Sequence, residues 1–246
     1  MNWLAETETN NEKIMNLFYA PDIAVNPQLP EEEGKHCTRV LRMGEGEEIT
    51  ITDGKGSFYK AVIEQANPKH CIVSIIETSI QPSLWPFYLH IAIAPTKNMD
   101  RIEWFAEKAT EIGINEITCL NCRYSERREV KSSRMEKTLV SAMKQSLKAT
   151  LPKFSGMTDF KTFVKQPFDG RKFIAHCEEG DKILLKHAYN TGENALILIG
   201  PEGDFSKEEI ELALSEGFTP ISLGESRLRT ETAALVACQS LHIINQ

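Results

Sequence analysis

Long apolar segments are missing from this 246-residue sequence, in which no run approaches the roughly 20 residues that a membrane-spanning helix needs. Its N-terminus also lacks the charged-then-apolar pattern of a signal peptide. No G-x-G-x-x-G motif opens an α/β pattern and no G-x-x-x-x-G-K-[ST] motif occurs, so the usual dinucleotide fingerprint and a P-loop are both excluded. We therefore expect a cytoplasmic protein that has no membrane segment.

Cysteine is sparse and does not suggest a disulfide framework. The six cysteines are scattered through a chain too long to depend on covalent staples, so we expect reduced thiols. Cys119 and Cys122 have the spacing of a metal or redox pair, but no second pair and no histidines at ligand spacing accompany them. We expect them to mark the buried end of a strand, and we predict no metal site.

Positive charge is in the minority, and the net charge of −7 by itself argues against a nucleic-acid partner. Its distribution points the other way. From Cys122 to Lys153, nine basic and three acidic residues give a charge of +6, which leaves −13 for the rest of the chain. A cationic patch of this kind can bind phosphates, although a solvated helix face explains the patch slightly better when it is taken alone.

Composition and periodicity divide the chain into a tail and two domains. Residues 1–14 are polar and aperiodic, so we predict a disordered tail whose deletion leaves stability and activity unchanged. Residues 15–80 show short alternating strands, including a hairpin over 48–63, and indicate a small β-barrel. The proline-containing segment 81–86 is typical of a linker. Residues 87–246 alternate strand and helix patterns, which predicts an α/β domain with a mainly parallel sheet.

Three helix signals stand out in the second domain. Ser133 with Glu136, and Ser206 with Glu209, have the spacing of capping boxes and predict two helix starts. The last helix, over 230–244, is apolar nearly all round, so we expect it to be buried.

The most informative part of the chain is its last fifth, where two strand patterns each continue into a glycine-containing turn and then a helix. The first spans 195–199 and leads into Gly200-Pro-Glu-Gly-Asp-Phe; the second spans 219–223 and leads into Gly224-Glu-Ser-Arg-Leu-Arg-Thr-Glu. Glycine permits close approach to a ligand, and helix N-termini present unpaired N–H groups. Ligands of open α/β sheets bind outside the carboxyl ends of strands, so we expect both turns to face one ligand. From the glycines alone, simple turns are an equally good explanation.

Several short segments together resemble a known family. They are 36–42, 53–54, 108–113, 125–127, 145–146, 198–203 with Phe205, 223–224 and 228–233. In this order and spacing they resemble the RsmE-like small-subunit ribosomal RNA uridine-N3 methyltransferases of the SPOUT superfamily, over nearly the whole chain after Met15.

The resemblance implies an α/β fold with a SPOUT-type trefoil-knotted methyltransferase domain, an N-terminal PUA-like β-barrel that helps to hold RNA, and a homodimer. It implies S-adenosyl-L-methionine (SAM) as cofactor and, as substrate, N3 of a specific uridine in 16S ribosomal RNA, free or in the small ribosomal subunit. The implied cofactor residues, acting chiefly through backbone groups, are Leu198, Gly200, Glu202, Gly203, Leu223, Gly224 and Leu228. The implied RNA contacts are Arg39, Arg42, Arg123, Arg127, Arg128, Arg134, Lys144 and Lys148.

Three positions depart from the family pattern. Asp204 stands where a glycine is frequent, Lys144 where an acidic residue is common, and Lys148 where an arginine often lies. The lysines keep or increase the positive charge, so the expected RNA contact is unaffected. Asp204 can cap the following helix.

Methyl transfer to uracil N3 is an in-line displacement, so we expect alignment of donor and acceptor to supply most of the rate. The N3 proton must also leave, which calls for a base or for stabilisation of the uracil anion. Arg229 is the candidate for anion stabilisation, and Glu231 is a candidate base or, equally, a cap of the final helix. We predict that Gly200→Val blocks SAM binding by filling the ligand's space.

Two other functions are compatible with these patterns. The first is a SPOUT enzyme that acts on another RNA or another RNA atom, such as the ribose 2′ oxygen. The second is a noncatalytic RNA-binding assembly protein that retains the fold.

Overall fold

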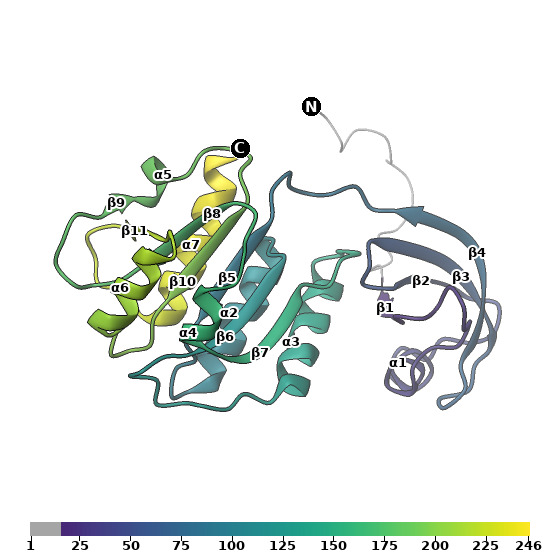
Figure 1. The fold of residues 1–246 in the computed structure, drawn as a ribbon. Coiled ribbons are helices and arrows are strands. Elements are labelled where there is room, and N and C mark those ends of the chain that lie inside the picture. Colours follow the sequence, from purple (N-terminus) through teal and green to yellow (C-terminus); the bar gives the residue numbers. More distant parts are fainter. Residues whose placement is uncertain (1–15) are drawn as a thin grey trace. The chain divides into compact units, whose positions relative to one another are not determined.

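A computed structural model describes residues 16–246, so the tail predicted over 1–14 lies outside the described residues. The chain divides into two compact units (Figure 1). The first unit contains the described chain up to Gln81 together with Leu147–Thr150, and the second contains Pro82–Ser146 and Leu151–Gln246. Within 16–246, no helix is long and apolar enough to cross a membrane.

The first unit is built on a four-stranded sheet in the order β1-β2-β3-β4. Its strands are β1 (Leu17–Tyr19), β2 (Glu48–Thr52), β3 (Ser57–Gln65) and β4 (Ile72–Ile80), and its short helices are α1 (Glu31–Lys35) and η1 (His36–Val40). β2 and β3 pair in antiparallel register, which confirms the predicted hairpin. Phe18, Ile51 and Ile63 are buried in the core of this unit.

The segment Leu147–Thr150 is far from the rest of the first unit in sequence but belongs to it in space. The hydroxyl of Thr52 donates a hydrogen bond to the carbonyl oxygen of Ala149 at 3.1 Å, and Lys55 forms an isolated bridge with Thr150. Local sequence patterns do not predict this association, because the contact joins residues about a hundred positions apart.

The second unit contains a seven-stranded sheet in the order β7-β6-β5-β10-β8-β11-β9. Every adjacent pair in this sheet is parallel, as the alternation of strands and helices predicted. The strands are β5 (Leu89–Ile93), β6 (Glu116–Asn121), β7 (Lys153–Asp159), β8 (Arg171–Ala175), β9 (Ile183–Leu184), β10 (Ala195–Ile199) and β11 (Thr219–Ser222).

Helices cover both faces of this sheet (Figure 1). Their bounds are α2 (Met99–Ile112), α3 (Ser132–Gln145), α4 (Phe160–Val164), α5 (Leu185–Ala188), α6 (Lys207–Ser215) and α7 (Thr230–Ile244). Because strand side chains alternate, Ile197 and Ile199 of β10 pack on the face with α2, α3, α5 and α7, whereas Leu196 and Leu198 pack on the face with α4 and α6.

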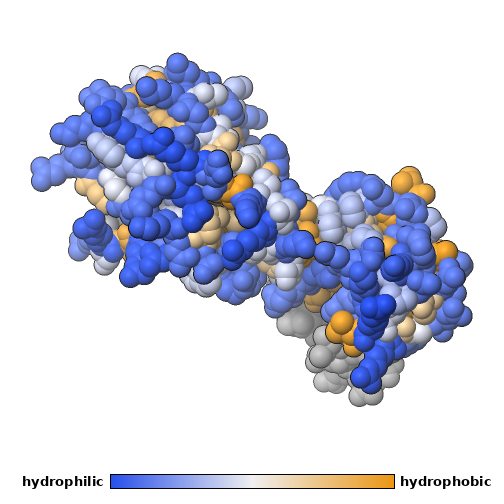
Figure 2. Space-filling model, turned by 90° about the horizontal axis from the view of Figure 1, so that it is seen from below, coloured by the Kyte–Doolittle hydropathy of each residue, from blue (hydrophilic) through white to orange (hydrophobic). Residues whose placement is uncertain are grey.

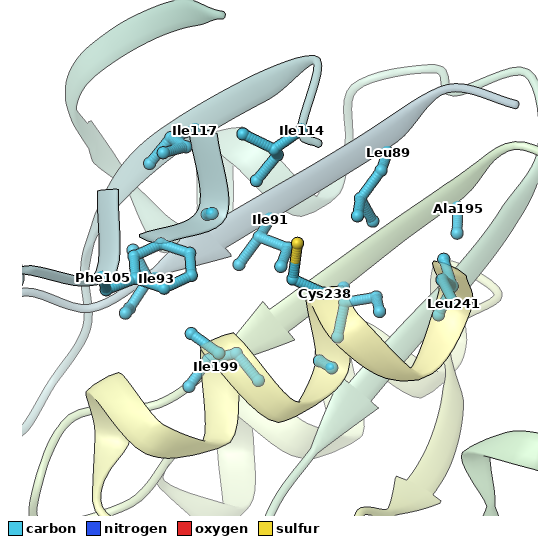
Figure 3. Close-up of a cluster of buried hydrophobic side chains, with 14 of the residues drawn as sticks. Leu89, Ile91, Ile93, Phe105, Ile114, Ile117, Ala195, Ile199, Cys238 and Leu241 are labelled. Atoms are coloured by element: carbon cyan, nitrogen blue, oxygen red, sulfur yellow. The ribbon is translucent and has the colours of Figure 1, made fainter. Parts of the chain in front are cut away.

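The helix α7 is buried along one side only. Ala234, Ala237, Cys238 and Leu241 pack against the sheet, and Figure 3 shows Cys238 and Leu241 directed toward the β5 side chains Leu89 and Ile91. Ile243, by contrast, is 60% exposed. The expectation of burial is therefore correct for most of this helix but not for its end.

One of the two predicted capping boxes is present. The side chain of Ser206 accepts from the backbone N–H of Glu209, and the Glu209 carboxylate accepts from the N–H of Ser206. The box predicted at Ser133 is wrong, because α3 begins at Ser132 and Ser133 is already inside its first turn.

The surface is largely hydrophilic on the face seen in Figure 2, where apolar residues occur in small groups. Single exposed apolar side chains are ordinary on soluble proteins.

Candidate functional site

Two loops meet at the carboxyl edge of the parallel sheet. We call residues 200–205, which follow β10, the first glycine loop, and residues 223–229, which follow β11, the second glycine loop. Thr230, at the end of the second loop, donates a hydrogen bond from its hydroxyl to the carbonyl oxygen of Gly200 at 3.1 Å. The two loops therefore lie next to each other, as one shared ligand would require, and the ligand itself stays a prediction.

Two adjoining cavities border these loops, and the smaller of them is lined by residues of both. The smaller, of about 430 Å³, is lined by the first glycine loop, by Arg101 and by Arg229, while the larger, of about 530 Å³, is lined by residues 221–228 and His176. Both volumes are in the range of small-molecule sites. The walls that the cavities share are Ala175, Cys177, Arg227, Leu228 and Ala233.

Most of the predicted cofactor residues line one of these cavities. Gly200, Glu202 and Gly203 line the smaller cavity, Leu223 and Gly224 line the larger, and Leu228 lines both. Leu198 lines neither, because it is fully buried in β10 and packs beneath α6. Its neighbour Ile199 borders the smaller cavity.

Asp204 fixes the first glycine loop in place. Its backbone has a left-handed φ of 65°, a conformation that Asp tolerates better than most residues. Its carboxylate accepts hydrogen bonds from the backbone N–H groups of Cys177 at 2.7 Å and Phe205 at 2.8 Å. The expected capping role is wrong because Ser206 occupies the N-cap of α6. Asp204 instead ties the loop to the chain that leaves β8.

Gly200 is required by the packing of the loop on itself. A Cβ at this position would lie 3.1 Å from the ring of Phe205, which is only 2% exposed and packs against Phe160. The prediction that Gly200→Val acts by filling the ligand's space is therefore wrong in its mechanism. The added side chain would meet a buried aromatic ring first.

The two candidate catalytic residues occupy different environments. Arg229 is exposed and lines the smaller cavity. Glu231 lies in the first turn of α7, is 7% exposed and lines neither cavity. One of its oxygens, Oε1, is 3.7 Å from Nε of Arg101, and the other, Oε2, is buried without a hydrogen-bond partner in the described structure.

Two residues that the sequence analysis does not name, Arg101 and His176, also line the cavities. Arg101 follows β5 and enters the site from the first turn of α2, whereas His176 directly follows β8. Burial, with a smaller effect of Lys182, lowers the pKa of His176, and its buried Nδ1 has no hydrogen-bond partner within 16–246. The position of His176 directly after a parallel strand was the available signal, whereas Arg101, in the first turn of α2, had no comparable signal.

The predicted RNA contacts in the second unit differ in their exposure and in whether the side chain already has a partner within the protein. Arg127 donates from Nη2 to the carbonyl oxygen of Lys97 at 2.7 Å, and it borders a cavity of about 480 Å³ together with the exposed Arg128. Arg123 is exposed and lies 5.9 Å from the ring centre of Tyr124. These residues form a cationic surface after β6.

Other predicted RNA contacts are already engaged. Arg134 forms ion pairs with Asp100 at 2.9 Å and Glu103 at 2.6 Å. Lys144 is half-buried near the end of α3, and Lys148 is buried in the segment that belongs to the first unit.

The two predicted RNA contacts of the first unit are exposed. Arg39 lies in η1 and Arg42 lies just after it.

Two family models match this chain. A model described as an RNA methyltransferase domain matches residues 83–242, which contain both glycine loops. A model described as an RNA methyltransferase PUA domain matches residues 29–76.

Solved structures match nearly the whole length of this chain. The crystal structure of a probable rRNA-methyltransferase from Porphyromonas gingivalis has a TM-score of 0.89 and 47% identity, covering 94% of this chain and 98% of that chain. A Legionella pneumophila protein described as a methyltransferase, solved with bound SAM, has a TM-score of 0.82 and 29% identity, covering 93% and 97%.

A curated relative agrees with these matches. Ribosomal RNA small subunit methyltransferase E of Mesomycoplasma hyopneumoniae is 32% identical over 231 residues, which cover 92% of this chain and 93% of the relative. The resemblance drawn from the sequence is thus confirmed, and this chain belongs to the RNA methyltransferase family that includes the ribosomal RNA small subunit methyltransferases E.

Proposed function

We propose that this protein transfers the methyl group of SAM to N3 of a uridine in small-subunit ribosomal RNA. One observation carries the proposal: the Thr230–Gly200 hydrogen bond joins the two glycine loops around adjoining cavities at the carboxyl edge of the sheet. The names of the relatives support the substrate class.

The residues around the cavities suit SAM. Leu223 and Leu228 offer apolar walls for an adenosyl group, and both loops bring peptide groups that can bind its polar edges. A Cβ on Gly224 would find no atom within 4 Å, so the backbone there borders open space. Arg227 lines both cavities and offers a cation for the carboxylate of the cofactor.

The chain contributes to the reaction by aligning the methyl donor with the acceptor, by excluding water and by supplying positive charge. SAM supplies a methyl group bound to a positively charged sulfur. Three arginines, Arg101, Arg227 and Arg229, line the smaller cavity and place positive charge where an anionic uracil ring would need it. We assign the acceptor base to this cavity for that reason.

The cationic surface around Arg123, Arg127 and Arg128 is the proposed grip on the RNA backbone. Arg39 and Arg42 of the PUA-like unit are proposed as further RNA contacts. We also propose a homodimer, as the family resemblance implies, and size-exclusion chromatography with light scattering tests this.

Mass spectrometric mapping of ribosomal RNA tests the function directly. RNA from cells with and without the protein should differ by one N3-methylated uridine in 16S ribosomal RNA. A methyl group on a ribose 2′ oxygen instead would contradict the chosen atom while leaving a methyltransferase. Calorimetry with SAM should show binding, and the absence of heat together with an unchanged modification map would identify a noncatalytic RNA-binding protein.

A further inference from the structure

The buried carboxylate of Glu231 and the guanidinium of Arg101 form an ion pair behind the smaller cavity. We propose that Arg101 supplies the positive charge that stabilises the deprotonated uracil ring, and that Glu231 is the positioning residue that holds Arg101 rather than the proton acceptor. This inference rests on the proposed function.

The pair brings together two elements that begin at the same edge of the sheet. Arg101 lies in the first turn of α2 after β5, and Glu231 lies in the first turn of α7 after the second glycine loop. Nε of Arg101 is 3.7 Å from Oε1 of Glu231; the side chains are 38% and 9% exposed. Arg101 reaches the cavity wall and Glu231 does not.

The surroundings of Glu231 favour a fixed anion. The N-terminus of α7 carries partial positive charge, which together with Arg101 attracts the carboxylate and keeps it in place. Burying a carboxylate with one oxygen unpartnered costs stability, so its retention calls for a reason. Orientation of a cation at the cavity wall supplies that reason.

Arg101 differs from the other arginines of this cavity in having a buried carboxylate oxygen 3.7 Å from its Nε. Arg227 and Arg229 are exposed and no carboxylate is paired with either in the described structure, although Glu202 and Asp204 also line the cavity. An arginine with no ion-pair partner loses side-chain rotamer freedom when it binds an anion. A guanidinium that already lies beside a carboxylate has less freedom to lose, so it stabilises developing charge on the substrate with less reorganisation. Arg101 is therefore better suited than Arg229 to stabilise the uracil anion.

The chemical step balances without a protein base. The N3 proton passes to a solvent water or hydroxide, and the guanidinium of Arg101 stabilises the negative charge left on the ring. The N3 electron pair then forms a bond to the methyl carbon while the carbon–sulfur bond breaks. The bonding pair of the broken carbon–sulfur bond stays on sulfur as a lone pair, and S-adenosylhomocysteine, with a neutral sulfur, leaves.

Single-turnover methylation of unmethylated small ribosomal subunits, measured across a range of pH, tests the proposal. Arg101→Gln should slow the reaction about 100-fold at neutral pH, as loss of an oxyanion donor does, and should move the rising limb of the profile to higher pH. Arg101→Lys should recover part of the rate. Lys161→Gln, which removes an exposed cation of α4 outside both cavities, should have no effect.

The double variant separates positioning from base catalysis. Glu231→Gln alone should slow the reaction about tenfold, as expected for a residue that orients another. Combined with Arg101→Gln, it should slow the reaction no further, because the residue it positions is already gone. Multiplicative losses would identify Glu231 as an independent base and overturn the assignment.

A binding measurement separates the uracil from the cofactor as the partner of Arg101. Calorimetry should show that Arg101→Gln binds SAM as tightly as the wild type does. A loss of SAM affinity that matches the loss of rate would place Arg101 on the cofactor and overturn the inference. Failure of the wild type to methylate uridine N3 would instead contradict the proposed function itself.

Discussion

The hydroxyl of Thr230 donates to the carbonyl oxygen of Gly200 across 3.1 Å, so the first residue of α7 is tied to the first residue after β10. The two residues are thirty positions apart, and both belong to segments that line the smaller cavity. This bond links the start of the first glycine loop to the end of the second.

Removal of the Thr230 hydroxyl should loosen the site. Thr230→Val keeps the shape of the side chain but leaves the buried Gly200 carbonyl without this partner, at a cost of about 1–3 kcal/mol in the free energy of unfolding. The affinity for SAM should fall as well, because the loops are no longer joined. Urea denaturation and calorimetry measure the two effects. Thr230→Ser, which retains the hydroxyl, should behave like the wild type, and an equal loss in both variants would contradict the role of the bond.

Gly200→Ala should destabilise the protein through Phe205. The new methyl group would lie 3.1 Å from a buried ring that has no free space, and overpacking of this kind costs about 1–3 kcal/mol. Adding Phe205→Leu should offset part of that loss, so the two substitutions should be non-additive in urea denaturation. Purely additive losses would mean that the methyl group is accommodated elsewhere in the loop.

Arg127→Ala combined with Arg128→Ala should weaken RNA binding and flatten its salt dependence. Each lost phosphate contact should reduce the slope of log affinity against log salt by roughly 0.7 to 0.9. Fluorescence anisotropy with a 16S ribosomal RNA fragment at several salt concentrations measures this. Arg134→Ala is the matched comparison and should have a smaller effect, because Asp100 and Glu103 already neutralise that guanidinium. Equal effects would show that charge in this region acts without regard to existing ion pairs.

Acid should destabilise the protein through His90. Burial, which outweighs the attraction of Glu116, lowers the pKa of His90 to about 4, while its Nε2 lies 2.8 Å from the Thr118 hydroxyl. Between pH 6.5 and about 4 the unfolded chain takes up a proton that the folded chain does not, so stability falls as pH falls. The loss should reach roughly 3 kcal/mol.

Urea denaturation of the wild type and of His90→Gln across that pH range tests the assignment. The variant should show a shallower decline in the free energy of unfolding, because it has no histidine to protonate at this position. Parallel declines in the two proteins would assign the acid sensitivity to other groups.

Strongly patterned segments could be predicted from the sequence. The strand at 195–199 and the helix at 230–244 have the predicted bounds, since a continuous apolar run and a long apolar helix each have few alternatives. The capping box at Ser206 was equally clear, because it depends on residues three positions apart. The box at Ser133 failed, since its spacing is satisfied equally well inside a helix that begins one residue earlier.

The sequence by itself determined the two loops and the family, because these depend on local patterns and on the order of motifs along the chain. Only the tertiary structure decided that β10 lies between β5 and β8, that Leu147–Thr150 joins the first unit, and that Arg101 faces Glu231. Each of these depends on contacts between residues about two dozen to more than a hundred positions apart. The side-chain periods of strands and helices carry no information on which distant segments pair.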